Sequence, residues 1–262
     1  MIMKNLLIYF ILFTAIFISK NASAQNAHFV QNGIIEFEKK SNMYAIIKKK
    51  INKDNESYYG PAFDQYKKNN PQTKIGKSVL NFTKDKSLYK VTSAEEPLTN
   101  NWVTRDMLAD LRNTVATNFG TETSIAQKNV YEETYLVKDS VRKINWKITD
   151  ETREIAGYEC RRANAVIMDS VYIVAYYTNQ IAVSGGPESF TGLPGMILGL
   201  ALPHENVNWF ATKVTEVAVP EKDLLPPTKG KPITNKGLIA IVTSALKNYG
   251  PEALSDLKIF GL

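Results

Sequence analysis

Residues 185–200, GGPESFTGLPGMILGL, decide the fold of this chain. Proline fixes φ at about −65° and lacks an amide donor, whereas glycine reaches positive φ, so the first half predicts a long, shaped turn. Leu193, Pro194 and Gly195 stand in the order that a type II turn requires. The apolar run Met196 to Leu200 then predicts a strand buried on both faces. We interpret the segment as a buried turn that seats a central strand; a turn that lines a ligand or partner site is the alternative.

The structural turn is assigned to six residues of this segment: Gly186, Pro187, Gly192, Leu193, Pro194 and Gly195. We expect positive φ at Gly192, at Gly195 or at both, because they flank the Leu-Pro pair. Glu188 lies on the more polar side of the loop, and its removal is expected to change stability by less than about 0.5 kcal/mol. The segment therefore predicts backbone shape rather than chemistry.

The N-terminus has the pattern of a secretory signal peptide. Lys4 precedes an apolar run over residues 6–18, and Ala22, Ser23 and Ala24 form a small-x-small cleavage site before Gln25. The run is too short to cross a membrane, and no later segment is apolar for long enough. We therefore predict a signal peptide over residues 1–24, a single β-rich domain over residues 25–262, no transmembrane span, and a periplasmic or secreted location.

Charge and cysteine content narrow the possibilities further. The net charge of +6 falls to +4 when Lys4 and Lys20 leave with the signal peptide. Scattered lysines favour a solvated basic surface, with attraction to lipid head groups or polysaccharide as the alternative; no nucleic-acid partner is predicted. Cys160 is the single cysteine, so an internal disulfide is excluded. Its place in an expected strand predicts a small buried hydrophobe.

Strand patterns dominate the rest of the chain. Strands are expected at 33–39, 78–83, 87–92, 114–119, 123–131, 134–138, 144–148, 160–168, 171–178, 196–202 and 209–217. Helices are expected at 44–51, where a short amphipathic pattern occurs, at 235–249, with Asn235 as the N-cap, and as a short tail at 253–259. A helical turn followed by a loop is expected at 58–70, and a turn at 149–153. Short turns between strands predict a mainly β fold: a curved antiparallel sheet or half-barrel with a C-terminal amphipathic helix.

Few residues are candidates for catalysis or metal binding. The mature chain has two histidines, His28 near its start and His204 in a turn beside Glu205. A hydrolase that uses His204 and Glu205 is an alternative, although the Gly-x-Ser-x-Gly motif is absent. His204 and Glu205 form one pair of metal-ligand type, which Cys160 could join only through the fold, so a metal site is the alternative. No phosphate-binding loop is present, and neither a metal nor another cofactor is predicted. Tyr172, Tyr176, Trp146 and Phe190 are the candidate binding residues, as aromatic side chains able to line a cleft; cross-strand packing is the alternative explanation.

Several short motifs together resemble the GLPGLI family, secreted proteins of Bacteroidota named for a hexapeptide. They are Trp146-Lys147-Ile148, Gly157-Tyr158-Glu159-Cys160 with Ala163, Ala175-Tyr176-Tyr177-Thr178 with Ile181, Gly186-Pro187, Phe190, and Gly192-Leu193-Pro194-Gly195-Met196-Ile197. Met196 replaces the leucine of the family, and Tyr176 stands where many relatives have tryptophan. The resemblance covers residues 146–217. It implies a signal peptide and a β-rich envelope protein, and it supplies no catalytic residues.

Three functions follow as hypotheses. The first is a non-enzymatic binding protein with an apolar groove between the sheet and the C-terminal helix, whose ligand is an apolar small molecule or lipid. The second is an envelope interaction or assembly factor that binds another envelope protein. The third is the hydrolase at His204 and Glu205. A concave side that is open favours the first hypothesis, and a filled core with an aromatic patch favours the second.

Overall fold

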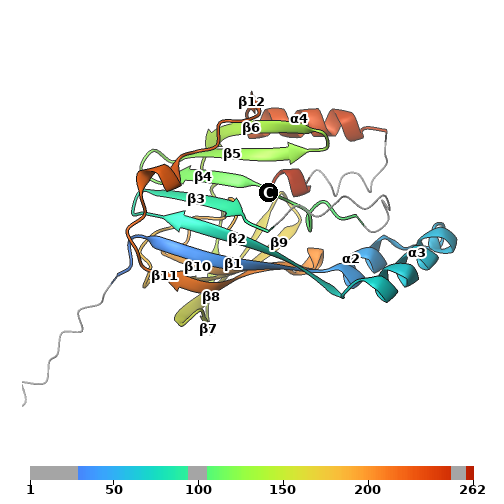
Figure 1. Ribbon diagram of the computed structural model, residues 1–262, viewed down its shortest axis with the longest axis horizontal. Helices are drawn as coiled ribbons and strands as arrows, with labels where there is room; N and C mark the ends of the chain where they lie inside the picture. The colour runs from blue at the N-terminus through green and yellow to red at the C-terminus, as the bar shows by residue number, and fades with distance from the viewer. Residues whose placement is uncertain (1–28, 94–104, 249–257) are drawn as a thin grey trace, which may run out of the picture.

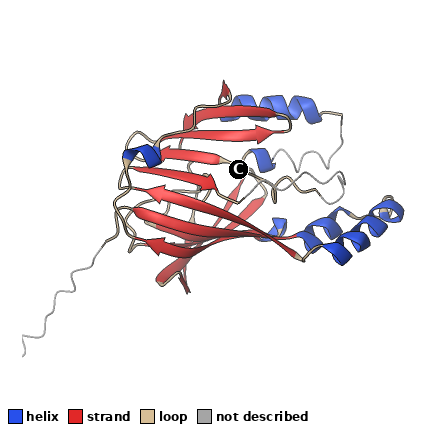
Figure 2. Ribbon diagram, in the orientation of Figure 1, coloured by secondary structure: helices blue, strands red, loops and turns tan. Residues whose placement is uncertain are grey.

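The computed structural model describes residues 29–93, 105–248 and 258–262. The predicted signal peptide, its predicted cleavage site, His28 and most of the expected tail at 253–259 lie outside these residues. The prediction of a mainly β fold is confirmed: twelve strands form one curved sheet (Figures 1 and 2). The strands are β1 (Gly33–Asn42), β2 (Thr73–Phe82), β3 (Lys86–Val91), β4 (Thr114–Asn118), β5 (Thr123–Val130), β6 (Glu133–Ser140), β7 (Lys147–Ile155), β8 (Tyr158–Ile167), β9 (Val171–Thr178), β10 (Met196–Leu202), β11 (Val207–Thr215) and β12 (Lys231–Ile233).

The order of the strands is β12-β6-β5-β4-β3-β2-β1-β11-β10-β9-β8-β7. Neighbours are antiparallel except β12, which pairs in parallel with β6. Because β12 and β7 are the outer strands, the sheet is open. Helices α2 (Met43–Lys50) and α3 (Glu56–Asn69) project from one end of the sheet, and α4 (Asn235–Leu246) packs beside β6 (Figure 1).

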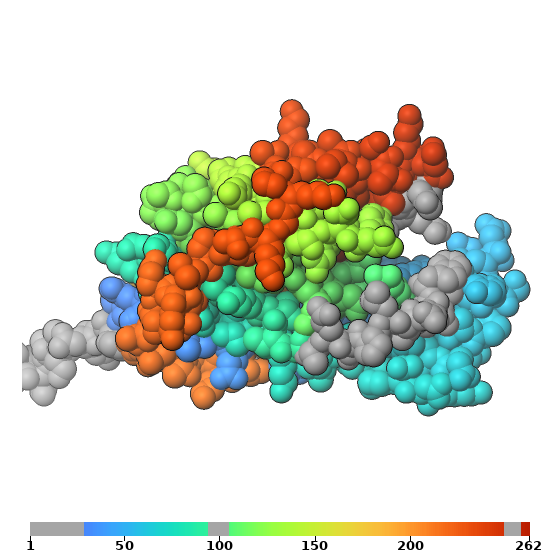
Figure 3. Space-filling model, turned by 45° about the horizontal axis from the view of Figure 1, so that its top comes forward, coloured from blue at the N-terminus to red at the C-terminus, as the bar shows by residue number. Residues whose placement is uncertain are grey.

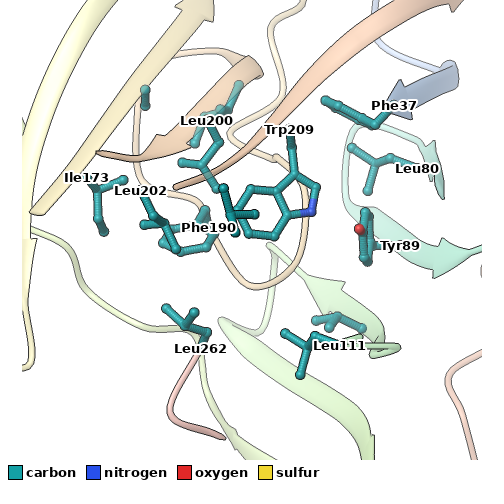
Figure 4. Close-up of a cluster of buried hydrophobic side chains, with 14 of the residues drawn as sticks. Phe37, Leu80, Tyr89, Leu111, Ile173, Phe190, Leu200, Leu202, Trp209 and Leu262 are labelled. Carbon is teal, nitrogen blue, oxygen red and sulfur yellow. The ribbon is translucent and has the colours of Figure 1, made fainter. Parts of the chain in front are cut away.

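The inner, concave face of the sheet is filled by side chains. The turn at residues 185–195 folds into it and buries Phe190 and Leu193. Figure 4 shows Phe190 beside Leu200, Leu202 and Trp209, with Tyr89 and Leu111 on the far side of the indole. This packing accounts for the folding role that the sequence assigned to the segment, because a single turn closes the core against strands from both halves of the sheet.

The central turn has the predicted backbone shape. Gly192 has φ of 95° and Gly195 has φ of 149°. A Cβ built on Gly195 would lie 2.1 Å from the carbonyl oxygen of Thr178, on the neighbouring strand β9, so only glycine fits there. The strand that follows is buried on both faces as predicted, since the first five residues of β10 are inaccessible to solvent.

The outer, convex face of the sheet has a covered half and a bare half. After β11, residues 216–230 cross β2 to β5 on their way to β12, a path that Figure 3 shows in orange over the green strands. Leu224, in the short 3₁₀ helix η3 (Glu221–Leu224), packs on Leu88 and Ala116 of β3 and β4. The Asn81 side-chain amide donates to the carbonyl of Asp223 at 3.1 Å. No such crossover lies over β8 to β11 among the described residues, although β7 approaches β11 on this side and places Ile155 beside Gly199.

Three local predictions need correction. Residues 149–153 are not a turn: they belong to β7, and a register shift between Ile148 and Thr152 accommodates the extra polar residues as a bulge. Residues 58–70 are not a helical turn and loop but most of α3, which Tyr44 of α2 stabilises through edge contacts with the rings of Phe63 and Tyr66. The N-cap of α4 is Thr234, whose hydroxyl accepts from the Gly237 amide, and not Asn235.

Candidate functional site: an aromatic face on the outer side of the sheet

The bare half of the outer face carries a group of aromatic and charged side chains. We call it the aromatic face, and it consists of Tyr172, Tyr176, Phe210, Arg153, Arg162 and Glu151. Strand register brings them together, because Arg162 of β8 stands opposite Tyr176 of β9. Gly199 of β10 stands between Tyr176 and Phe210 of β11 and leaves room for the phenyl ring.

The rings share one cation. The Tyr176 and Phe210 ring centroids are 6.4 Å apart. The Arg153 guanidinium lies 5.8 Å from the Tyr176 centroid and 4.8 Å from the Phe210 centroid. A planar guanidinium near two aromatic faces is attracted by the negative charge of each ring face. The arrangement holds both rings in place while their outer surfaces stay partly exposed.

A carboxylate that accepts two side-chain hydrogen bonds borders the rings. Arg162 donates to Glu151 at 2.5 Å, and the Tyr176 hydroxyl donates to the other carboxylate oxygen of Glu151 at 3.2 Å. The hydrogen bond from Arg162 lowers the pKa of Glu151, so this carboxylate is ionised at neutral pH. Burial raises the pKa of Tyr176, and its hydroxyl stays protonated. The face therefore combines apolar ring surfaces with charged hydrogen-bonding groups, a combination able to bind a polar ligand that also has apolar patches.

Sequence reasoning found part of this face. Tyr172 and Tyr176 are two of the four predicted binding residues, and both lie on the outer side of β9. The structure does not bring Trp146 and Phe190 to them. The Trp146 indole N–H donates to the carbonyl of Thr191 at 2.9 Å and so supports the central turn, whereas Phe190 is fully buried in the core. Arg153 and Phe210 were missed because their proximity depends on register across four strands.

His204 is not placed for acid–base catalysis. It lies in the 3₁₀ turn η2 (Pro203–Glu205), and its ring packs edge-on against Tyr172 with centroids 6.1 Å apart. Glu205 pairs instead with Lys49 at 3.5 Å. In the described parts of the chain, no side chain forms a hydrogen bond to the His204 ring, and the geometry that the hydrolase hypothesis requires is missing.

A second polar group is buried inside the fold. Glu188 was expected on the polar side of the loop, but only 3% of it is exposed, and it adopts φ of 52°. Its carboxylate accepts from the Asn113 amide at 3.0 Å. Burial raises its pKa, and the nearby cation Lys39 opposes that rise. The expected polar, solvated position of Glu188 is wrong, and we now expect its removal to cost more than about 0.5 kcal/mol because its buried partners would be left unpaired.

Lys39 is buried on the same inner face. Its ammonium group donates to the carbonyl of Leu108 and lies 5.2 Å from the ring centroid of Trp209. Burial lowers its pKa from 10.5 to about 8, while Glu188 acts in the opposite direction. With only 5% of it exposed, Lys39 is part of the core. Period-two alternation places Lys39 on the same side as Ile35 and Phe37, but a charged residue at the end of the pattern hid its burial.

The described residues hold no metal-binding geometry. In residues 29–93, 105–248 and 258–262, no group of three His, Cys, Asp or Glu side chains is close enough to hold an ion. Cys160 is fully buried in β8, as predicted, and burial raises the pKa of its thiol to about 12. Such a thiol is protonated and unreactive at neutral pH.

Among the described residues, no helix is both long and apolar enough to cross a bilayer.

Comparison with known proteins gives one family match and several structural neighbours. Residues 113–231 match the family model described as "N-glycanase peptide, N-terminal domain". No curated protein matches. Among solved structures, PNGF-II in a C2 space group is 17% identical with a TM-score of 0.48, and PNGF-II in a P21 space group is 21% identical with a TM-score of 0.47. Each alignment covers 78% of this chain, which spans only 31% and 32% of those chains.

These matches correct the resemblance to the GLPGLI family. The motifs that carried it lie within the segment that matches the N-glycanase domain model, and no match supports GLPGLI or a source in Bacteroidota. The physical reason is that the motifs are short and rich in turn residues. The geometry around Gly192 and Gly195 accounts for the hexapeptide without reference to any one family. The matched segment contains every residue of the aromatic face.

Proposed function

We propose that this chain is a secreted, non-enzymatic recognition domain that binds the carbohydrate of glycoproteins on its aromatic face. The observation that carries the proposal is the contrast on the outer side of the sheet. Residues 216–230 cover β2 to β5, whereas β8 to β11 present Tyr172, Tyr176 and Phe210 with charged neighbours. These rings are partly exposed, and partly exposed aromatic groups beside charged side chains are typical of interaction surfaces.

The chemistry of the face suits a sugar. A pyranose ring has an apolar C–H surface that stacks on aromatic rings and a rim of hydroxyls that need hydrogen-bond partners. The rings of Tyr176 and Phe210 supply the stacking surface. Arg162 and Glu151 supply charged donors and acceptors for the sugar hydroxyls. Arg153 holds the rings from one side, which reduces the entropy lost when a ligand orders them.

The family match supports the choice of a glycan. The model that matches residues 113–231 describes the N-terminal domain of an N-glycanase, and it spans all six residues of the aromatic face. A domain that holds the glycan of a glycoprotein would serve an N-glycanase by keeping the substrate nearby. A periplasmic or secreted location after cleavage at Ala24 is part of the proposal, since glycoproteins are met outside the cytoplasm.

The test is titration calorimetry with an N-glycan core oligosaccharide. We expect the parent protein to bind, and the double variant Tyr176→Ala/Phe210→Ala to lose at least tenfold in affinity because both stacking surfaces go. Tyr58→Ala is the matched control, since Tyr58 is 61% exposed on α3, outside the face. The proposal fails if the parent shows no saturable binding, or if the control loses as much affinity as the double variant.

A second candidate function rests on a hollow of about 340 Å³ between α4 and the β5–β6 hairpin. Val130, Tyr135, Ile241, Val242 and Ala245 contribute most of its apolar lining, with Tyr131, Glu132 and Glu133 at its border. Small-molecule sites occupy volumes of about 300 Å³ upward, so an apolar ligand or a single acyl chain is the ligand class that fits.

Palmitate binding tests this second function. We expect Ala245→Trp, which fills the hollow, to abolish binding that the parent shows. Thr243→Trp is the control, because Thr243 is exposed on the same helix and does not line the hollow. Equal palmitate binding by the parent and Ala245→Trp would place the ligand elsewhere.

A further inference from the structure

One cation of the aromatic face has no acidic partner. Arg162 donates to Glu151 at 2.5 Å, so these two opposite charges neutralise each other. Among the described residues, no carboxylate forms an ion pair with Arg153 and no acceptor forms a hydrogen bond with it, because its contacts are with two aromatic rings. Two guanidinium groups and one carboxylate leave one positive charge on the face, and that charge belongs to Arg153.

The guanidinium of Arg153 is available to a ligand. The residue is exposed on β7, an outer strand of the sheet. Its guanidinium carbon lies 4.8 Å from the Phe210 centroid and 5.8 Å from the Tyr176 centroid, and this attraction acts through the charge of the cation. The N–H donors of a guanidinium lie in one plane and form a fork that matches the two oxygens of a carboxylate. Arg153 can therefore offer this fork to a carboxylate from outside the chain.

The surroundings of Arg153 suit a sugar that carries a carboxylate. The rings of Tyr176 and Phe210 border the guanidinium, so a sugar stacked on them would place a substituent beside the cation. Hydrogen bonds between a guanidinium and a carboxylate are about twice as strong as those between neutral groups. A neutral sugar would leave the positive charge without a partner, whereas a carboxylate would neutralise it.

Glu151 does not stand in the way of such a ligand. It is ionised at neutral pH, but Arg162 pairs with it and the Tyr176 hydroxyl donates to its other oxygen. Its negative charge is therefore balanced within the face. A second carboxylate beside Arg153 would meet a net attraction.

We propose that Arg153 determines the specificity of the aromatic face by binding the carboxylate of an acidic sugar, so that the face prefers oligosaccharides that carry such a sugar to their neutral counterparts. The inference rests on the proposed function, since it requires that the aromatic face bind glycans. It adds the class of sugar and the residue that selects it. Because salt screens the attraction between exposed charges, the preference falls as ionic strength rises.

Three matched ligands test the preference by titration calorimetry. They are an N-glycan oligosaccharide that ends in galactose, the same oligosaccharide with one terminal sialic acid, and the sialylated form whose carboxylate is converted to an amide. The amide keeps the shape of the acid and removes its charge. At low ionic strength we expect the parent protein to bind the acid at least tenfold more tightly than either neutral ligand.

The variant Arg153→Gln identifies the residue responsible. The readout is the ratio of the dissociation constants for the amide and the acid, measured for each protein, so that a general weakening from loosened rings cancels. We expect this ratio to fall to about one in Arg153→Gln. Arg161→Gln is the matched control, because Arg161 is an exposed cation that pairs with Asp150 and points to the other side of β8. The control should keep the ratio of the parent.

The outcomes separate this inference from the function on which it rests. Equal affinity of the parent for the acid and the amide would overturn the inference and leave glycan binding in place. No saturable binding of any of the three ligands would overturn both. A preference for the acid that Arg153→Gln retains, or that Arg161→Gln loses to the same extent, would overturn the assignment to Arg153.

Discussion

Strands β8 to β11 present two faces with opposite properties, and the comparison separates what folds the protein from what it offers to a partner. Their inner side chains, such as Trp209 and Ile173, are fully buried under the central turn. Their outer side chains include Tyr172, Tyr176 and Phe210, which stay partly exposed. Arg153 lies against Tyr176 and Phe210, and His204 against Tyr172. Because successive residues of a strand alternate between faces, one sequence encodes both surfaces. The two faces should therefore respond differently to substitution.

The largest loss of stability is expected from Gly195→Ala, on the inner side. The new Cβ would meet the Thr178 carbonyl oxygen at 2.1 Å, and the backbone of β9 cannot move without disturbing the sheet. We expect a loss of more than about 3 kcal/mol, above the cost of about 1–2 kcal/mol for positive φ alone. Gly157→Ala is the matched control: it has φ of 83° but open space around it, and should cost only about 1 kcal/mol. Urea denaturation measures both, and similar losses would mean that the clash is relieved.

The second prediction concerns how the free energy of unfolding depends on pH through two buried lysines of the inner face. The folded pKa values of Lys39 and Lys128 are about 8, below the ordinary value of 10.5. Between these values the unfolded chain binds more protons than the folded one, so the free energy of unfolding should rise with pH, by up to about 3 kcal/mol per lysine. Denaturation from pH 7 to pH 10 measures the slope. We expect Lys39→Met to flatten it and Lys213→Met, exposed on the outer side, to leave it intact.

The third prediction compares the covered and bare halves of the outer face. Leu224→Ala removes a buried side chain from the crossover on β3 and β4 and should cost about 2–3 kcal/mol. Tyr176→Ala, on the bare half, should cost less than about 1 kcal/mol, because its ring is already partly solvated. Thermal denaturation of the two variants measures the difference between these two losses of stability. A loss at Tyr176 as large as that at Leu224 would make the aromatic face a structural surface.

The extent to which sequence predicted this structure differs between the two faces. Alternation and apolar runs indicated most strands and the buried β10, because burial on one or both faces leaves a direct pattern. The positive φ at Gly192 and Gly195 followed from turn chemistry. Local patterns could not reveal the bulge in β7 or the helical continuation in α3, since each depends on partners distant in sequence.

Sites built from several strands were the hardest to predict. Tyr172 and Tyr176 were found because they share one strand, whereas Arg153 and Phe210 join them only through register. Glu188 was misjudged because a glutamate in a glycine-rich loop has the pattern of a solvated turn. Its burial depends on Asn113, which comes 75 residues earlier in the chain.

Mapping by nuclear magnetic resonance tests the central claim most directly. The parent protein, with labelled aromatic and methyl groups, is titrated with the N-glycan core oligosaccharide. The account predicts saturable shift changes at Tyr172, Tyr176 and Phe210, with the inner-face residues Trp209 and Ile173 unchanged. Shift changes confined to the inner face or to the hollow beside α4, or none at all, would contradict the assignment of the aromatic face as the recognition surface.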